Sequence, residues 1–130
     1  MNKVTEEKII YKELSYKITG LLFKIHTKLG RYCREKQYAD AFEKLLFEEG
    51  VAFEREKEVP IEYIDNKLTN KVDFLIDGKI VLELKVKHLI LKEDYYQTQR
   101  YLQAGKYNLG LIVNFRNKYL KPIRIIRINS

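Results

Sequence analysis

The sequence predicts an α/β fold with a mixed β-sheet flanked by helices and the order α-α-β-β-β-α-β-β. Three observations predict it: two stretches of helical periodicity come first, alternating strands follow, and a further helix precedes two closing strands. The gap between the third and fourth strands is long enough for a helical crossover, so these two strands can be parallel. The length of 130 residues suits a single domain over residues 1–130.

Three helices are predicted from the spacing of apolar residues. The first ends at Gly30, which is a natural C-terminal stop. Its apolar stripe consists of Leu14, Ile18, Leu21, Leu22, Ile25 and Leu29. The second carries the same spacing from Tyr38 to Leu46 and ends at Gly50. The third is rich in Tyr and Gln and covers about Lys92 to Ala104.

Five strands are predicted around these helices. Alternation of apolar and polar residues indicates a first, half-buried strand region. Its apolar positions are Val51, Phe53, Val59, Ile61 and Tyr63. Val72–Ile76 and Ile80–Val86 form a hairpin, because Asp77-Gly78 supplies the positive φ of a tight turn. Leu109–Phe115 is typical of a buried strand, and Ile123–Ile128 closes the chain.

The basic charge is concentrated near the C-terminus. Seven basic residues and no Asp or Glu follow Asp94, and seven is also the net charge of the chain. Such a segment attracts polyanions, nucleic acid above all, although ordinary solubilising charge is an equal alternative. The residues expected to bind nucleic acid are Arg100, Arg116, Lys118, Lys121 and Arg124.

Composition narrows the classes of protein to consider. No apolar run approaches the roughly 20 residues that span a bilayer, and the N-terminal residues lack the apolar core of a signal peptide. The single cysteine, Cys33, cannot form an internal disulfide. We therefore expect a cytoplasmic protein without a membrane anchor.

The residues that carry chemistry are Asp73, Glu83 and Lys85. Asp73 and Glu83 each interrupt an apolar strand, where a carboxylate is costly unless something compensates its charge. A hard cation such as Mg²⁺ prefers oxygen ligands and would provide that compensation. Lys85 lies two residues from Glu83 and therefore on the same strand face. There an ammonium could orient an attacking water or stabilise a pentacovalent phosphate.

The hairpin register decides whether these side chains meet. If Asp77-Gly78 is a strict two-residue turn, Asp73 pairs with Leu82, and Glu83 points to the other face of the sheet. The site then needs a correction of one residue, from either a β-bulge or a longer loop. Convergence would favour an enzyme, whereas opposite faces would favour a module that only binds.

From Glu13 to Arg127 the chain resembles the GxxExxY family, which is placed in the PD-(D/E)XK nuclease superfamily. The matching stretches are Lys28-Leu29-Gly30, Glu35-Lys36-Gln37-Tyr38, Val72-Asp73-Phe74-Leu75-Ile76, Val81-Leu82-Glu83-Leu84-Lys85, Gln97–Leu102 and Leu109–Phe115. The resemblance implies a restriction-endonuclease-like core with Asp73 and Glu83 as metal ligands and Lys85 as the catalytic lysine.

The resemblance also implies roles for three further residues. Glu35 would be the helical carboxylate that completes the site. Gln97 and Tyr101 resemble a QxxxY element, and their spacing puts them on one helix face. Tyr32 stands where the family has its glycine, so Asp40 and Glu43, further along the same helix, remain alternative third carboxylates.

The sequence therefore predicts a nuclease that hydrolyses phosphodiester bonds, in DNA rather than RNA, with Mg²⁺ or Mn²⁺. A homodimer is a candidate assembly. The alternative is a nucleic-acid-binding or assembly module that keeps the fold without turnover, because fold and function separate easily.

Overall fold

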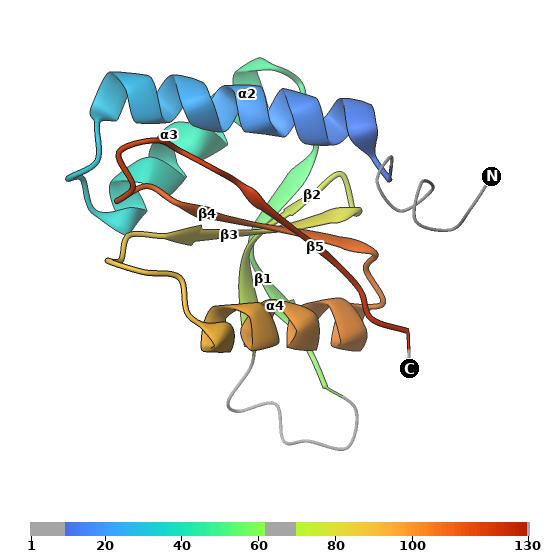
Figure 1. The fold of residues 1–130 in the computed structure, drawn as a ribbon. Helices are drawn as coiled ribbons and strands as arrows, with labels where there is room; N and C mark the ends of the chain where they lie inside the picture. The colour runs from blue at the N-terminus through green and yellow to red at the C-terminus, as the bar shows by residue number, and fades with distance from the viewer. Residues whose placement is uncertain (1–9, 62–69, 130) are drawn as a thin grey trace.

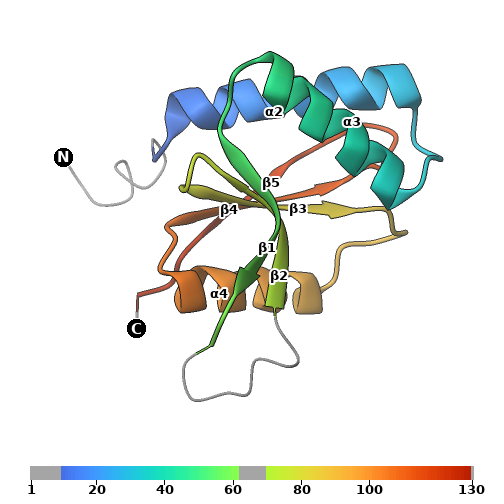
Figure 2. The same cartoon turned by 180° about the vertical axis from the view of Figure 1, so that it is seen from behind.

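The computed structural model describes residues 10–61 and 70–129. A single sheet lies between helices on both faces (Figures 1 and 2). Helices α2 (Lys12–Leu29) and α3 (Glu35–Glu48) cover one face, and α4 (Lys92–Gly105) covers the other. No helix among the described residues is sufficiently long and apolar to cross a membrane.

The sheet has five strands in the spatial order of the chain. They are β1 (Phe53–Val59), β2 (Asn70–Ile76), β3 (Ile80–Lys85), β4 (Leu109–Asn114) and β5 (Ile123–Ile126). Only the β3–β4 pair is parallel, and α4 forms the crossover between these two strands. The predicted mixed sheet and the predicted order of elements are therefore confirmed.

Four of the strands are shorter than the sequence pattern predicts, whereas β2 begins at Asn70, two residues earlier than predicted. Val51 and Ile61 lie outside β1, and Tyr63 falls outside the described residues. Ile128 lies beyond β5 and is 62% exposed, so its apolar side chain belongs to no buried face. The apolar pattern predicts the approximate position of a strand, whereas hydrogen bonding to the neighbouring strand determines its first and last residues.

Two apolar clusters hold the layers together. The larger joins α2 and α3 to the sheet, with Ile18, Phe42 and Leu82 fully buried in it. The smaller joins α4 to the opposite face and includes Tyr101 and Leu102. All six residues of β4 are buried, as a strand covered on both faces must be.

Gly110 lets α4 lie close against β4. A Cβ built on Gly110 would stand 2.7 Å from Cγ2 of Thr98, a fully buried side chain of α4. Glycine is required here by the close approach of the helix, since any larger residue would push α4 outward. The position of α4 matters because this helix carries Gln97 and Tyr101.

The alternation of side chains between the two faces of the sheet is interrupted in β2 at Asp73. Val72 packs in the cluster under α4, whereas Phe74, two residues later, packs in the cluster under α2 and α3. Regular alternation would put both side chains on one face. The register places Asp73 across from Glu56, whose φ of 53° lies in the left-handed region. This local distortion sets Asp73 at the boundary between the two clusters.

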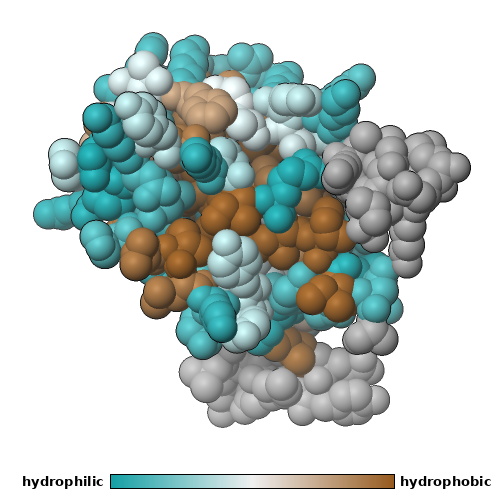
Figure 3. All heavy atoms as spheres, in the orientation of Figure 1, coloured by the Kyte–Doolittle hydropathy of each residue, from teal (hydrophilic) through white to brown (hydrophobic). Residues whose placement is uncertain are grey.

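β5 forms one edge of the sheet. Apolar residues appear in a band between α2 and α4, on the side of the molecule where β5 runs (Figure 3). Pro122 directly precedes the strand, and Arg124 and Arg127 place charge on it and after it. Proline and charge at an edge strand discourage pairing with a foreign strand.

Candidate active site

The turn between β2 and β3 places Asp73 opposite Glu83. Ile76 pairs with Ile80 and Phe74 with Leu82, and the same register continued by one residue brings Asp73 to Glu83. The strict two-residue turn is therefore wrong, and a loop longer by one residue supplies the offset. Asp77 and Gly78 hold φ values of 52° and 63°, and Lys79 is the additional residue.

The two carboxylates replace part of the backbone ladder. The backbone N–H of Asp73 donates to Oε2 of Glu83 at 3.3 Å, and the N–H of Leu84 donates to Oδ2 of Asp73 at 2.7 Å. Glu83 is only 2% exposed, and its other oxygen, Oε1, is buried without a hydrogen-bond partner among the described residues. A buried acceptor without a partner is costly, and a cation would satisfy it.

The environment of Glu83 opposes its negative charge. Burial raises the pKa of the Glu83 carboxyl to about 10, and the neighbouring charge of Asp73 acts in the same direction. Lys85 acts in the opposite direction, since a nearby positive charge favours the ionised carboxylate. A divalent cation beside Glu83 would act as Lys85 does, with a larger charge.

Lys85 is held between β3 and α4. Its Nζ donates to Oε1 of Gln97 at 2.9 Å and lies 3.8 Å from Oδ1 of Asp94. Asp94 is buried at the start of α4, where it accepts from the backbone N–H of Leu91 at 2.7 Å and from Nζ of Lys87 at 2.9 Å. The ammonium of Lys85 is thus fixed by groups on another element, on the same strand face as Glu83.

Glu35 is one of the three carboxylates of α3 that the sequence offers to complete the site. It is the first residue of α3 and lines a pocket of about 330 Å³ together with Asp73. Burial raises the pKa of Glu35, and the charge of Asp73 raises it further. Asp40 and Glu43 instead each accept from Nη1 of Arg55 at 2.7 Å. Of these three carboxylates, Glu35 is the one that lines the pocket with Asp73.

Tyr101 and Gln97 face the site from α4. Tyr101 is 4% exposed, and its pKa is raised to about 12 by burial and then by the charges of Glu83 and Asp73. Gln97 acts in the opposite direction and lowers the pKa of this hydroxyl. The predicted spacing on one helix face thus brings both side chains to the carboxylates and to the lysine.

The residues present fit a divalent cation held by few protein ligands. Across residues 10–61 and 70–129, no group of three or more His, Cys, Asp or Glu side chains is arranged to hold a metal ion. Mg²⁺, however, is usually bound by one or two carboxylates, with water and substrate phosphate filling the remaining positions. Asp73 and the unpartnered Oε1 of Glu83 meet that smaller requirement.

Comparison with protein families matches residues 12–128, nearly the whole chain, to the PD-(D/E)XK nuclease superfamily. The chain belongs to this superfamily. The match is to the superfamily as a whole, so the GxxExxY family remains a prediction. A search among curated proteins finds no match.

A solved structure supports the same fold. The crystal structure of SSO0001 is similar over 95% of this chain, with a TM-score of 0.55 and 20% sequence identity. The chain spans 63% of the length of that protein. At this level of identity the likeness concerns the PD-(D/E)XK fold and not the activity.

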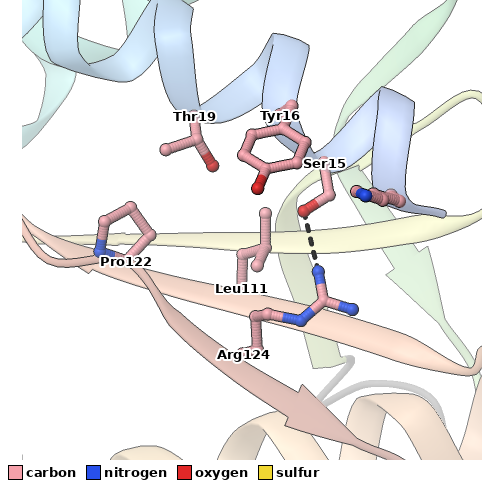
Figure 4. A pocket seen from close by; sticks show the side chains of 7 residues that line it. Ser15, Tyr16, Thr19, Leu111, Pro122 and Arg124 are labelled. Carbon is pink, nitrogen blue, oxygen red and sulfur yellow. Dashed lines mark hydrogen bonds between the residues drawn. The ribbon is translucent and has the colours of Figure 1, made fainter. Parts of the chain in front are cut away.

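The basic residues predicted to bind nucleic acid do not gather on one face of this nuclease-like domain. Arg124 donates to Oγ of Ser15 at 2.8 Å and to the carbonyl of Ile10 at 3.0 Å, in a pocket beside α2 (Figure 4). Arg100 lies on α4, across the sheet from α2. Arg116 is tied to the loop before α3, whereas Lys118 and Lys121 are exposed.

Sequence reasoning missed three buried residues that support the PD-(D/E)XK site. Asp94 fixes the start of α4 by accepting from the backbone N–H of Leu91, and acidic residues in the first turn are a recognised helix-start signal. Asn114 bonds both the N–H and the carbonyl of Lys87, which holds the segment after β3. Tyr38 anchors the loop before α3 by donating to the carbonyl of Gly30 at 2.6 Å. The apolar spacing predicts Tyr38 as a buried position of α3, but no local pattern indicates the polar contacts of Tyr38 or of Asn114.

Proposed function

We propose that this protein is a divalent-metal-dependent nuclease that hydrolyses phosphodiester bonds in DNA. One observation carries the proposal: the buried Oε1 of Glu83 has no partner, beside Asp73 and on the strand face of Lys85. Two carboxylates and an ammonium on neighbouring strands are the groups that metal-assisted phosphoryl transfer requires. Membership of the PD-(D/E)XK superfamily points the same way.

Asp73 and Glu83 would hold Mg²⁺ or Mn²⁺. When bound, such an ion lowers the pKa of water and offsets negative charge on a phosphoryl group. Glu83 would contribute Oε1, which accepts no hydrogen bond from the described residues, while its Oε2 continues to accept from the N–H of Asp73. Asp73 would contribute the oxygen that does not accept from Leu84.

Lys85 would stabilise the reacting phosphate. In hydrolysis a water oxygen forms a bond to phosphorus while the bond from phosphorus to the leaving oxygen breaks, and negative charge builds on the phosphoryl oxygens. The Lys85 ammonium is already oriented by Gln97 and Asp94, so it can meet that charge without reorganising.

Glu35 would serve the attacking water. Its carboxylate shares a pocket with Asp73, and burial raises its pKa above that of an exposed glutamate. A carboxylate of raised pKa is a better proton acceptor, and a water approaching phosphorus must lose a proton. Tyr101, which lies four residues after Gln97 on the same face of α4, would help position Gln97 and, through it, Lys85.

The test is degradation of a panel of single-stranded, duplex and branched DNA, with an RNA of matched sequence, in Mg²⁺ or Mn²⁺. Asp73→Asn should abolish cleavage, because an amide is a poorer ligand for the cation than a carboxylate. The fold should be retained, because the amide oxygen can still accept from the N–H of Leu84. Asp40→Asn is the matched control, since the Asp40 carboxylate is paired with Arg55 and Lys36 and does not line the pocket that Glu35 shares with Asp73.

The outcomes separate the proposal from its rival. Metal-dependent cleavage by wild type and Asp40→Asn, but not by Asp73→Asn, supports a nuclease. Equal cleavage by all three proteins places the activity elsewhere. Binding of the panel without any cleavage supports the non-catalytic nucleic-acid-binding module.

A further inference from the structure

Two loops are fastened together at one end of the sheet. Residues 30–34 join α2 to α3, and residues 115–122 join β4 to β5. Nε of Arg31 donates to the carbonyl of Arg116 at 2.9 Å, and Nε of Arg116 donates to the carbonyl of Arg31 at 3.0 Å. Nε2 of His26 lies 2.8 Å from the carbonyl oxygen of Asn117. The reciprocal pair joins the loops into one surface, which we call the two-loop platform.

A buried ring supports the platform from below. Tyr38 donates its hydroxyl hydrogen to the carbonyl of Gly30 and accepts from the N–H of Cys33 at 3.2 Å. Its ring stacks on Phe115, with centroids 4.1 Å apart and planes 7° from parallel. Both loops therefore rest on one rigid contact, so the platform's shape is set before any ligand arrives.

The outer surface of the platform is aromatic and positive. Tyr32 is 77% exposed, although the guanidinium carbons of Arg31 and Arg116 lie 5.3 and 5.9 Å from its ring centroid. Tyr119 is 72% exposed, with the ammonium of Lys118 at 5.5 Å. Neither loop contains Asp or Glu, and no described carboxylate forms an ion pair with these cations.

This chemistry suits the parts of an unpaired nucleotide. Each arginine uses its Nε for the opposite loop, which leaves the terminal Nη groups for phosphate oxygens. An exposed tyrosine ring offers a surface on which a base can stack, and stacking needs a base that is not already stacked within a duplex. Aromatic and cationic groups in alternation are therefore a surface for single strands rather than for paired DNA.

The platform borders the candidate active site on both loops. Glu35 directly follows Arg34 in the chain and is the first residue of α3. The N–H of Phe115 donates to the carbonyl of Lys85 at 2.9 Å. A strand bound on the platform would therefore lie next to the segments that carry Glu35 and Lys85.

We infer that the two-loop platform binds an unpaired segment of nucleic acid and leads it to the site of Asp73, Glu83 and Lys85. The inference rests on the proposed nuclease function and adds a substrate class to it, namely single strands and the unpaired ends or flaps of duplexes. Tyr32, which replaces the glycine of the resembling family, is the residue that supplies the stacking surface at this position.

The test compares binding of a fluorescein-labelled oligothymidylate and of a blunt mixed-sequence duplex by fluorescence anisotropy, in EDTA so that no strand is cut. The variants are Tyr32→Ala, Tyr119→Ala and the double variant. Phe47→Ala is the matched control, because Phe47 is 80% exposed near the end of α3 remote from Glu35. Each platform substitution should weaken single-strand binding by about 5- to 150-fold.

The result expected is a loss confined to the single strand, with Phe47→Ala equal to wild type. Unchanged single-strand affinity in the double variant would overturn the inference and leave the nuclease proposal intact. Failure of wild type to bind any nucleic acid at low salt would overturn both.

A second measurement uses wild-type protein and needs no variant to fold. Ultraviolet crosslinking to an oligonucleotide that contains 5-iodouridine, followed by peptide mapping, should place the crosslink in residues 30–34 or 115–122. Crosslinks confined to other segments would contradict the inference even where the variants behave as expected.

Discussion

Asp73 and Glu83 stand opposite each other on β2 and β3, and each carboxylate accepts a backbone N–H from the other's strand. The pair thus belongs to the sheet as well as to the site. This double role separates what a substitution does to the fold from what it does to the chemistry, and it makes the choice of replacement important.

Asp73→Ala should unfold more easily than Asp73→Asn. Alanine leaves the N–H of Leu84 without the acceptor that now lies at 2.7 Å, whereas the asparagine carbonyl can take its place. A buried donor without a partner costs about 1–3 kcal/mol. Urea denaturation of both variants in EDTA should show this difference in the free energy of unfolding. Equal stabilities would mean that the bond contributes nothing to the fold.

Lys85→Ala should lower turnover far more than it lowers affinity for DNA. The ammonium acts on charge that develops only in the transition state, and loss of one such contact typically costs about 10²- to 10³-fold in rate. Lys85→Arg should rescue poorly, because a planar guanidinium does not reproduce a compact ammonium. Single-turnover kinetics and anisotropy measure the two effects separately.

The matched control for this lysine is Lys36→Ala. Lys36 lines the pocket shared by Glu35 and Asp73, but its ammonium pairs with Asp40 and its side chain is 81% exposed. Its loss should leave turnover near the wild-type value. A comparable loss in both variants would point to general positive charge rather than to a placed ammonium.

Glu83→Gln should stabilise the metal-free protein at pH 8. Burial, with Asp73 beside it, raises the pKa of Glu83 from 4.5 to about 10, so the folded state holds the proton more tightly than the unfolded state does. The stability linked to this proton is complete below the unfolded pKa and is lost as pH rises towards the folded one. Glutamine does not ionise, so the variant does not lose this stability as pH rises. At pH 8 its free energy of unfolding should exceed that of wild type by about 1–3 kcal/mol.

The measurement is thermal unfolding in EDTA at pH 5 and at pH 8. The variant's advantage should be larger at pH 8, and Mn²⁺ should reduce it by stabilising wild type alone. An advantage that is the same at both pH values would show that Glu83 does not titrate as its surroundings imply.

Gly110→Ala should destabilise the protein and lower its activity together. The added Cβ would meet Cγ2 of Thr98 at 2.7 Å, so α4 would have to shift, and Gln97 with it. Overpacking of this kind costs about 1–3 kcal/mol. Gly20→Ala is the control, because nothing lies within 4 Å of its Cβ and alanine favours a helix by about 1 kcal/mol. Calorimetric melting should show shifts of opposite sign.

Much of the architecture could be predicted because it follows from local patterns. The stripe of α2 and the apolar runs of β3 and β4 repeat at the periods of their elements. Asp73, Glu83 and Lys85 stand out because charge in such runs is rare. The spacing of Gln97 and Tyr101 also places them on one face without knowledge of the fold.

The register of the β2–β3 hairpin and the contacts of the basic residues could not be predicted. Asp77-Gly78 signals a turn, but whether Lys79 joins the turn or the strand depends on pairing across the whole hairpin. Arg124 has the charge of a phosphate ligand, yet it bonds Ser15, which lies 109 residues away in the chain. Charge in a sequence does not reveal which partner the fold will bring to it.

Crystals soaked in Mn²⁺, with data collected at the manganese absorption edge, test whether Asp73 and Glu83 bind a metal ion. An anomalous peak is expected within coordination distance of Oε1 of Glu83 and of a carboxylate oxygen of Asp73, and none is expected in crystals of Asp73→Asn. No peak at these residues at saturating Mn²⁺, or a peak that Asp73→Asn leaves unchanged, would contradict metal binding by this pair.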